Sequence, residues 1–197
     1  MQKLIDAALF IDRFNDRVAS VAKWSIAAAC AISAANAFVR YGFNFSSNAF
    51  LEIQWYLFGA VFLLGAGYTF LQNAHVRIDV VAGKLSMRVR TYIDIVGILV
   101  FLLPMCWFMI EFAWPVVAGA YASGEMSSNA GGLIRWPVYA LVPAGFALLG
   151  LQAVSELIKR LAFLQGKAPN PLLEGGHDGN ADSPAQPQLD ATEEVQK

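Results

Sequence analysis

Residues 53–71 read IQWYLFGAVFLLGAGYTFL, a stretch without a charged side chain. A transmembrane helix needs about 20 mostly apolar residues, because a hydrocarbon core about 30 Å thick is crossed at 1.5 Å per residue. Three other stretches have the same character, so that the predicted spans cover about residues 20–40, 51–71, 93–118 and 134–158. The sequence therefore predicts an all-α membrane protein with four transmembrane helices.

The composition of the whole chain also indicates a membrane protein. Of its 197 residues, 57% are hydrophobic and only 15% are charged, and the mean hydropathy is +0.49. A soluble domain usually carries about 25% charged and 45–50% apolar residues. The 14 Lys and Arg residues against 15 Asp and Glu residues leave a net charge of −1 and no basic patch. We therefore do not expect nucleic acid as a partner.

The positions of the basic residues predict the orientation of the spans. Twelve of the fourteen lie in the N-terminal segment, in the loop between spans two and three, and in the C-terminal segment. Only Arg40 and Arg135 fall on the other side of the predicted membrane. Because basic residues concentrate in cytoplasmic loops, both termini are expected in the cytoplasm.

The two ends of the chain differ from the spans. Residues 1–18 are predicted to form an amphipathic helix on the membrane surface, because their apolar residues recur at helical spacing. These residues are Leu4, Ala8, Ile11, Phe14 and Val18. Residues 164–197 contain four prolines and six acidic residues and are expected to form a disordered acidic tail. The four-helix transmembrane domain is expected between these ends, at residues 19–163.

No group of residues in the sequence predicts catalysis. A haem-bearing membrane anchor needs paired histidines in its spans, and a membrane thiol oxidoreductase needs a proximal pair of cysteines. The two histidines lie outside the predicted spans, while Cys30 and Cys106 lie in different spans. We expect no enzymatic activity, no metal site and no cofactor.

Four carboxylates are expected at the ends of spans, which leaves the middle of every span without charge. Glu52 is predicted at the outer end of span two, and Asp94 and Glu156 at inner ends. Glu111 follows Asp94 by about 25 Å of helix, which predicts a position close to the outer surface. Either these groups face water and lipid headgroups, or Glu52 and Glu111 contact a partner protein. A cation-coupled exporter would need a carboxylate near the middle of a span.

Small residues recur in the spans at spacings that allow helices to approach closely. They are Ala27, Ala31 and Ala35 in span one, Gly59, Gly65 and Gly67 in span two, and Gly145 and Gly150 in span four. These residues pack within the four-helix unit or face another protein. Asn36, Gln54 and Gln152 are candidates for hydrogen bonds between helices.

The predicted inner loop, residues 72–92, reads QNAHVRIDVVAGKLSMRVRTY and is too polar to span a membrane. One interpretation is that its basic residues bind the headgroups of membrane lipids. The other is a polar latch in which His75, Arg77 and Asp79 pair among themselves or with another subunit.

Three stretches follow one another in a distinctive order: EIQWYLF at residues 52–58, FLLGAG at 62–67 and HVRIDVV at 75–81. In this order and spacing they resemble the small membrane subunit, the Q component (DctQ-like), of tripartite ATP-independent periplasmic (TRAP) transporters. The resemblance covers about residues 19–163, including the number of spans. Residues 124–137, GEMSSNAGGLIRWP, are similar to the outer loop of carboxylate-transporting branches of that family.

The resemblance implies a supporting role in transport at the bacterial inner membrane. In such systems a periplasmic substrate-binding protein delivers an organic acid, and a large permease subunit carries the substrate and sodium sites. The small subunit packs against the large one as a scaffold. Residues expected at the partner interface or in a structural latch are Glu52, Trp55, His75, Arg77, Asp79 and Glu111. The alternative function is a stand-alone, homo-oligomeric four-helix channel or exporter.

Overall fold

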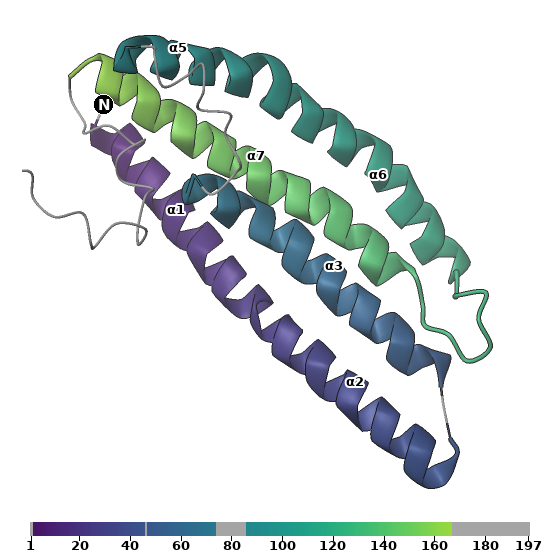
Figure 1. Cartoon of the computed structure of the whole chain (residues 1–197). Helices are drawn as coiled ribbons and strands as arrows, with labels where there is room; N and C mark the ends of the chain where they lie inside the picture. The colour runs from purple at the N-terminus through teal and green to yellow at the C-terminus, as the bar shows by residue number, and fades with distance from the viewer. Residues whose placement is uncertain (1, 46, 74–85, 167–197) are drawn as a thin grey trace, which may run out of the picture.

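The structure is a computed structural model and describes residues 2–45, 47–73 and 86–166. All regular structure in these ranges is helical (Figure 1). The helices are α1 (Gln2–Ala22), α2 (Trp24–Phe43), α3 (Asn48–Leu71), α5 (Met87–Gly97), the π-helical turn η1 (Ile98–Leu102), α6 (Leu103–Ser123) and α7 (Trp136–Leu164). Four continuous helical stretches, 2–43, 48–71, 87–123 and 136–164, are long and apolar enough to cross a membrane. The prediction of an all-α protein with four spans is thereby confirmed.

The helix α7 is the centre of the bundle. It packs against α3 on one side and α6 on the other, and it also contacts α1 and α5, whereas α2 packs against α3 (Figure 1). Two connections lie at one end of the bundle, residues 44–47 between α2 and α3 and residues 124–135 between α6 and α7. We call this the hairpin end. We call the opposite end, where α1 begins and α7 finishes, the terminal end.

The contact between α3 and α7 depends on glycine. A Cβ atom added to Gly145 would stand 2.7 Å from the carbonyl oxygen of Leu63, and one added to Gly67 would stand 3.2 Å from that of Leu148. Without these side chains the two backbones approach closely, which increases van der Waals contact where no hydrophobic force drives helices together. Gly67 and Gly145, predicted as packing positions, therefore pack within the chain.

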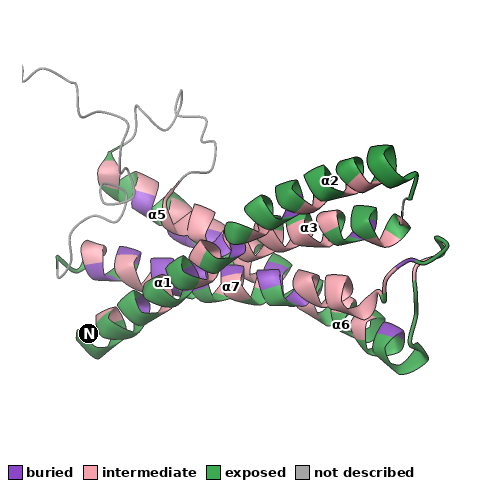
Figure 2. Ribbon diagram, turned by 90° about the horizontal axis from the view of Figure 1, so that it is seen from below, coloured by how far each residue is buried: buried purple, intermediate pink, exposed green. Residues whose placement is uncertain are grey.

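The alanines of the first span face the other way. Ala27, Ala31 and Ala35 are exposed, whereas Ala29 on the opposite side of α2 is buried. In Figure 2 the outer surfaces of α2 and α6 are largely exposed, and buried residues gather along α7. The side chains of Ala27, Ala31 and Ala35 thus point away from the other described helices.

The third span is longer than the predicted 93–118, because the helical stretch runs from Met87 to Ser123. Its π-helical turn immediately precedes Pro104 and is closed by the bond from the Leu103 amide to the Ile98 carbonyl. A proline lacks an amide hydrogen and its ring clashes with the carbonyl four residues earlier. A π-turn at this position absorbs the irregularity, so the helix continues through the proline.

The N-terminal helix α1 leads into α2 through a turn at Lys23 and packs on α3 and α7. Its buried residues are Ala8, Asn15 and Ala22, at seven-residue spacing, while Leu4 and Phe14 stay exposed. Helix α1 is therefore a packed part of the bundle. Its location at the membrane surface remains a prediction, and residues 167–197 of the predicted tail lie outside the described residues.

Candidate functional site

At the hairpin end, Glu52 of α3 holds the loop between α6 and α7. The carboxylate is buried, with the residue only 5% exposed. Its Oε1 accepts hydrogen bonds from the Ser127 hydroxyl and, at 2.8 Å, from Asn129 Nδ2. Its Oε2 accepts a 2.7 Å bond from the Leu133 amide. These four residues form what we call the Glu52 clamp, in which an ionised carboxylate satisfies three donors of one loop.

The close fit of this loop requires Gly132. A Cβ at this position would stand 2.9 Å from Glu52 Oε1 and 2.5 Å from the Cβ of Ser127. Further bonds from α3 support the loop: Asn48 Nδ2 donates to the Ala130 carbonyl at 3.0 Å, and the Tyr56 hydroxyl donates to the Ile134 carbonyl at 3.2 Å. The first three turns of α3 thus fix the loop along its length.

A second polar contact closes the base of the loop. Arg135 Nη1 donates to the Tyr139 hydroxyl at 3.2 Å and lies 3.6 Å from Glu125 Oε1, to which Tyr139 also donates. The hydrogen bond to Tyr139 raises the pKa of Arg135 above its usual range. The guanidinium therefore stays charged, although an ion pair this exposed contributes little to stability.

Trp55, another predicted site residue, lies beside the clamp but turns outward. It is 70% exposed and borders a shallow hollow of about 190 Å³ that also includes Tyr139. The structure thus places Glu52 in an internal contact and leaves Trp55 accessible. Their predicted contact with a partner subunit remains a proposal.

At the terminal end a buried polar network joins α1 to α7. Asp12 accepts bonds from Gln152 Nε2 at 2.8 Å, from the Ser155 hydroxyl at 2.6 Å and from Lys159 Nζ at 3.0 Å. Asn15 Nδ2 donates to Gln152 Oε1 at 2.7 Å. The predicted interhelical role of Gln152 is thereby confirmed, whereas among the described residues Gln54 bonds only within its own helix, to the Phe50 carbonyl.

The same network continues to α5 through charged groups. Glu156 pairs with both Lys159 and Arg160, and Arg160 Nε lies 3.3 Å from Asp94 Oδ2. Glu156 and Arg160 are each 1% exposed. Breaking such a buried pair is costly, because the remaining charge loses its counter-ion. We call the whole group the terminal cluster: Asp12, Asn15, Asp94, Gln152, Ser155, Glu156, Lys159 and Arg160.

The terminal cluster was not predicted, although the sequence of α7 indicates it. Its polar residues stand at positions 152, 155, 156, 159 and 160, which fall on one face of a helix. A polar face at the end of an apolar span is compatible with a second helix that offers polar side chains, and not with water alone. The interpretation of Glu156 as a hydrated boundary residue is wrong, because Glu156 is 1% exposed and pairs with Lys159 and Arg160.

The level of Glu111 along the bundle follows from the packing of α6 on α7. Cys106 of α6 lies against Gly150 of α7, where an added Cβ would be 3.6 Å from the cysteine Cβ. Helices α6 and α7 are antiparallel. Glu111 follows Cys106 by five residues and Gly145 precedes Gly150 by five, so Glu111 lies level with Gly145. Gly145 in turn touches Leu63 of α3. Leu63 lies about 12 Å from the terminal end of α3 and about 22 Å from its hairpin end. Glu111 is thus level with the interior of the span.

The predicted position of Glu111 near the outer membrane surface stays a prediction. The prediction counted from Asp94, which bonds to Arg160 beyond the level at which α3 ends. Glu111 is exposed and has no hydrogen bond or ion pair with the described residues. A charged carboxylate at the centre of a lipid-facing helix costs about 2.5–3.5 kcal/mol, so such residues are rare and usually functional.

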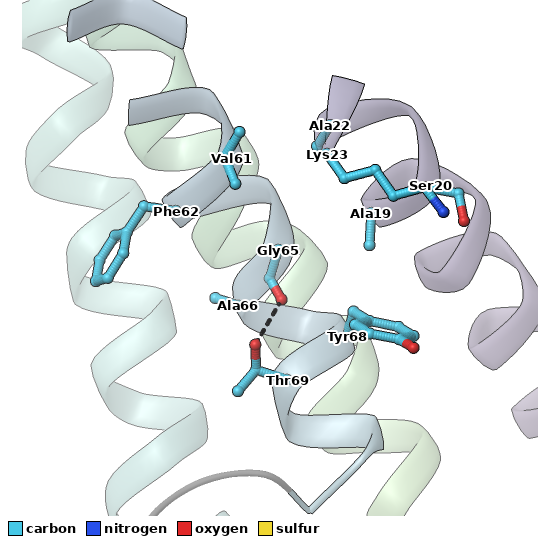
Figure 3. A pocket seen from close by; sticks show the side chains of 10 residues that line it. All are labelled: Ala19, Ser20, Ala22, Lys23, Val61, Phe62, Gly65, Ala66, Tyr68 and Thr69. Carbon is cyan, nitrogen blue, oxygen red and sulfur yellow. Dashed lines mark hydrogen bonds between the residues drawn. The ribbon is translucent and has the colours of Figure 1, made fainter. Parts of the chain in front are cut away.

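A groove of about 590 Å³ lies between α3 and the junction of α1 with α2. Figure 3 shows Ala19, Ser20 and Lys23 on one side and Gly65 and Tyr68 of α3 on the other. The groove is mainly apolar, and an added Cβ on Gly65 would meet no atom within 4 Å. The expected contact with membrane lipids stays a prediction.

The remaining predicted site residues, His75, Arg77 and Asp79, lie outside the described residues. In the described ranges no group of three His, Cys, Asp or Glu side chains could hold a metal ion. The polar groups found here hold helices and a loop together. The class of protein that this arrangement defines is an all-helical, multi-pass membrane protein whose buried polar residues hold its own helices and loop together.

The comparison with known families agrees with this class. The sequence model of the family described as "Tripartite ATP-independent periplasmic transporters, DctQ component" matches residues 29–163. The chain belongs to this family, and is therefore a small TRAP transporter subunit and not an enzyme. No curated protein and no solved structure matches the chain.

Proposed function

We propose that this chain is the scaffold subunit of a sodium-coupled transporter that imports an organic acid across the bacterial inner membrane. It packs against the large permease subunit, which carries the substrate and sodium sites, and a periplasmic substrate-binding protein delivers the substrate. Both termini are cytoplasmic, which places the Glu52 clamp on the periplasmic side and the terminal cluster on the cytoplasmic side.

The observation that supports a scaffold role is the use of the buried carboxylates. The Glu52 carboxylate accepts hydrogen bonds from three donors of the loop, and the Glu156 carboxylate forms ion pairs with Lys159 and Arg160. Each joins segments that are distant in the sequence or closes a charge network inside the chain. A substrate or sodium site would instead need polar groups left free for the ligand.

Uptake measurements with defined subunits test this function. Proteoliposomes that contain this chain, the large permease subunit and the substrate-binding protein are expected to accumulate a radiolabelled organic acid when a sodium gradient is imposed. Omission of this chain should abolish uptake, while the binding protein still binds the acid in solution. Uptake that proceeds equally well without the chain would contradict the proposal.

The second candidate is a stand-alone, homo-oligomeric exporter, and Glu111 is the observation that favours it. An exporter coupled to a cation needs a carboxylate at the depth where Glu111 lies. Family membership and the outward direction of Glu111 favour the scaffold role. Transport by vesicles that hold this chain alone, lost in Glu111→Gln, would establish the exporter instead.

The loop residues His75, Arg77 and Asp79 are proposed as a latch to the large subunit. Asp79→Ala is expected to weaken assembly or uptake while the chain still inserts in the membrane. Unchanged recovery of the complex and unchanged uptake would leave only the binding of lipid headgroups as a role for this loop.

A further inference from the structure

Glu111 lies on the side of α6 that is turned away from α7. The residues of α6 that face α7 are Cys106 and Ala120, which are buried, together with partly buried residues at helical spacing between them. Glu111 follows Cys106 by five residues, a rotation of about 140° around the helix axis. We call the surface around it, formed by Trp107, Phe108, Glu111 and Pro115, the α6 outer face.

The α6 outer face is apolar except for its one carboxylate. Trp107 is 68% exposed and Phe108 is 53% exposed, and both precede Glu111 by three or four residues on the same side of the helix. The Phe108 ring stacks on Phe112, which leaves the exposed Trp107 ring as the aromatic group near the carboxylate, and the faces of such rings attract positive charge. The surface is thus complementary to a single positive charge carried at the same depth of the bilayer.

We propose that the α6 outer face binds a transmembrane helix of the large permease subunit through a lysine or arginine that pairs with Glu111. The proposal deepens the proposed function and rests on it, since it names the contact by which the scaffold holds its partner. Charge complementarity identifies the occupant: lipid tails offer no cation, and the same face of a second copy would bring two carboxylates together. Pairing lets both charges lie inside the bilayer, where each would be unfavourable alone.

Substitution of Glu111 in the full chain, with the large permease subunit in lipid nanodiscs, tests this contact. The apparent Kd between the labelled subunits is expected to rise about thirtyfold or more for Glu111→Leu, because the partner's buried cation is left unpaired. Glu111→Gln should weaken binding less, since its amide still accepts a hydrogen bond, and Glu111→Asp should restore part of the affinity. Val116→Leu, an exposed change on another side of α6, is the matched control and should bind normally.

The stability of the isolated chain separates this role from a structural one. Glu111→Leu removes a carboxylate from the lipid-facing surface, so the variant alone should insert and resist unfolding at least as well as the original chain. Loss of binding together with unchanged or increased stability supports the proposal. Normal binding by Glu111→Leu, or loss of stability in the isolated variant, would overturn it. Failure of even the unsubstituted chain to bind the large subunit would instead refute the proposed function.

A photo-crosslinking experiment identifies the partner residue directly. With benzoylphenylalanine in place of Trp107, irradiation of the complex should link this chain to a transmembrane peptide of the large subunit that contains a lysine or arginine. Crosslinks only to a second copy of this chain, or only to lipid, would overturn the proposal.

Discussion

The amide of Leu133 donates a 2.7 Å hydrogen bond to Oε2 of Glu52, across 81 positions of the sequence. This bond and those from Ser127 and Asn129 join the start of the second span to the loop between the third and fourth. Since α3 and α7 also pack along their length, the hairpin end is fixed both by polar bonds and by helix contact.

Glu52→Gln should loosen the hairpin end. The substituted amide would place an NH₂ group against one of the donors that the carboxylate now accepts, at a cost of about 2–3 kcal/mol. We expect faster hydrogen exchange at the Leu133 amide and a lower free energy of unfolding in mixed micelles. Glu125→Gln is the matched control at an exposed position and should stay within about 0.5 kcal/mol. Unchanged exchange at Leu133 would show that the loop does not depend on Glu52.

Gly145→Ala should separate α3 from α7, because its Cβ would stand 2.7 Å from the Leu63 carbonyl oxygen. Overpacking of this kind costs about 1–3 kcal/mol, which can be measured by unfolding in mixed micelles. The control is Gly65→Ala, whose Cβ would meet no atom within 4 Å. It should be neutral, or stabilise α3 by up to about 1 kcal/mol through helix propensity. Equal effects of the two variants would contradict the close approach at Gly145.

Arg160→Met should destabilise the terminal end by about 3–5 kcal/mol, since it leaves buried Glu156 with one cation fewer. Lys159 still pairs with Glu156, so the lower part of this range is expected. The double variant Glu156→Leu/Arg160→Met should recover most of the lost stability, because it removes both members of the buried pair. Additive losses in a double-mutant cycle would argue against coupling between the two residues.

Asp12→Asn should detach α1 from α7, because Asp12 accepts bonds from Gln152, Ser155 and Lys159. A local loss of 1–2 kcal/mol corresponds to about five- to thirtyfold more frequent opening. Trypsin should therefore cleave at Arg13 and Arg17 correspondingly faster. Asp6→Asn serves as control, since Asp6 is exposed and accepts a bond only from Gln2 of its own helix in the described chain. Equal cleavage rates in the two variants would show that Asp12 does not hold α1.

Four features were predictable because they depend on local pattern. The apolar stretches predicted four spans, since their length and hydropathy are properties of the segments themselves. The motifs of span two and the following loop predicted the family, and the family comparison confirms it. Gly67 and Gly145 were predicted as close-packing positions, and Gln152 as an interhelical hydrogen-bond donor, and the structure places them there.

The depth of Glu111 and the coverage of Glu156 could not be derived from the segments one at a time. The depth of a residue depends on how far neighbouring helices are shifted along one another, and that shift is fixed by contacts such as Cys106 with Gly150. Similarly, Glu156 belongs to a buried network that forms only in the folded chain, where α1 brings Asp12 to Lys159 and α5 brings Asp94 to Arg160.

The sequence by itself thus determined that this chain is a four-span membrane subunit of a TRAP transporter, because hydropathy and short motifs are carried by contiguous residues. Only the tertiary structure decided which of the carboxylates Glu52, Glu111 and Glu156 are satisfied within the described chain. Glu52 finds its donors in a distant loop and Glu156 lies in a buried charge network, whereas Glu111 faces outward on α6. That difference arises from helix register and rotation, which a linear pattern of residues does not specify.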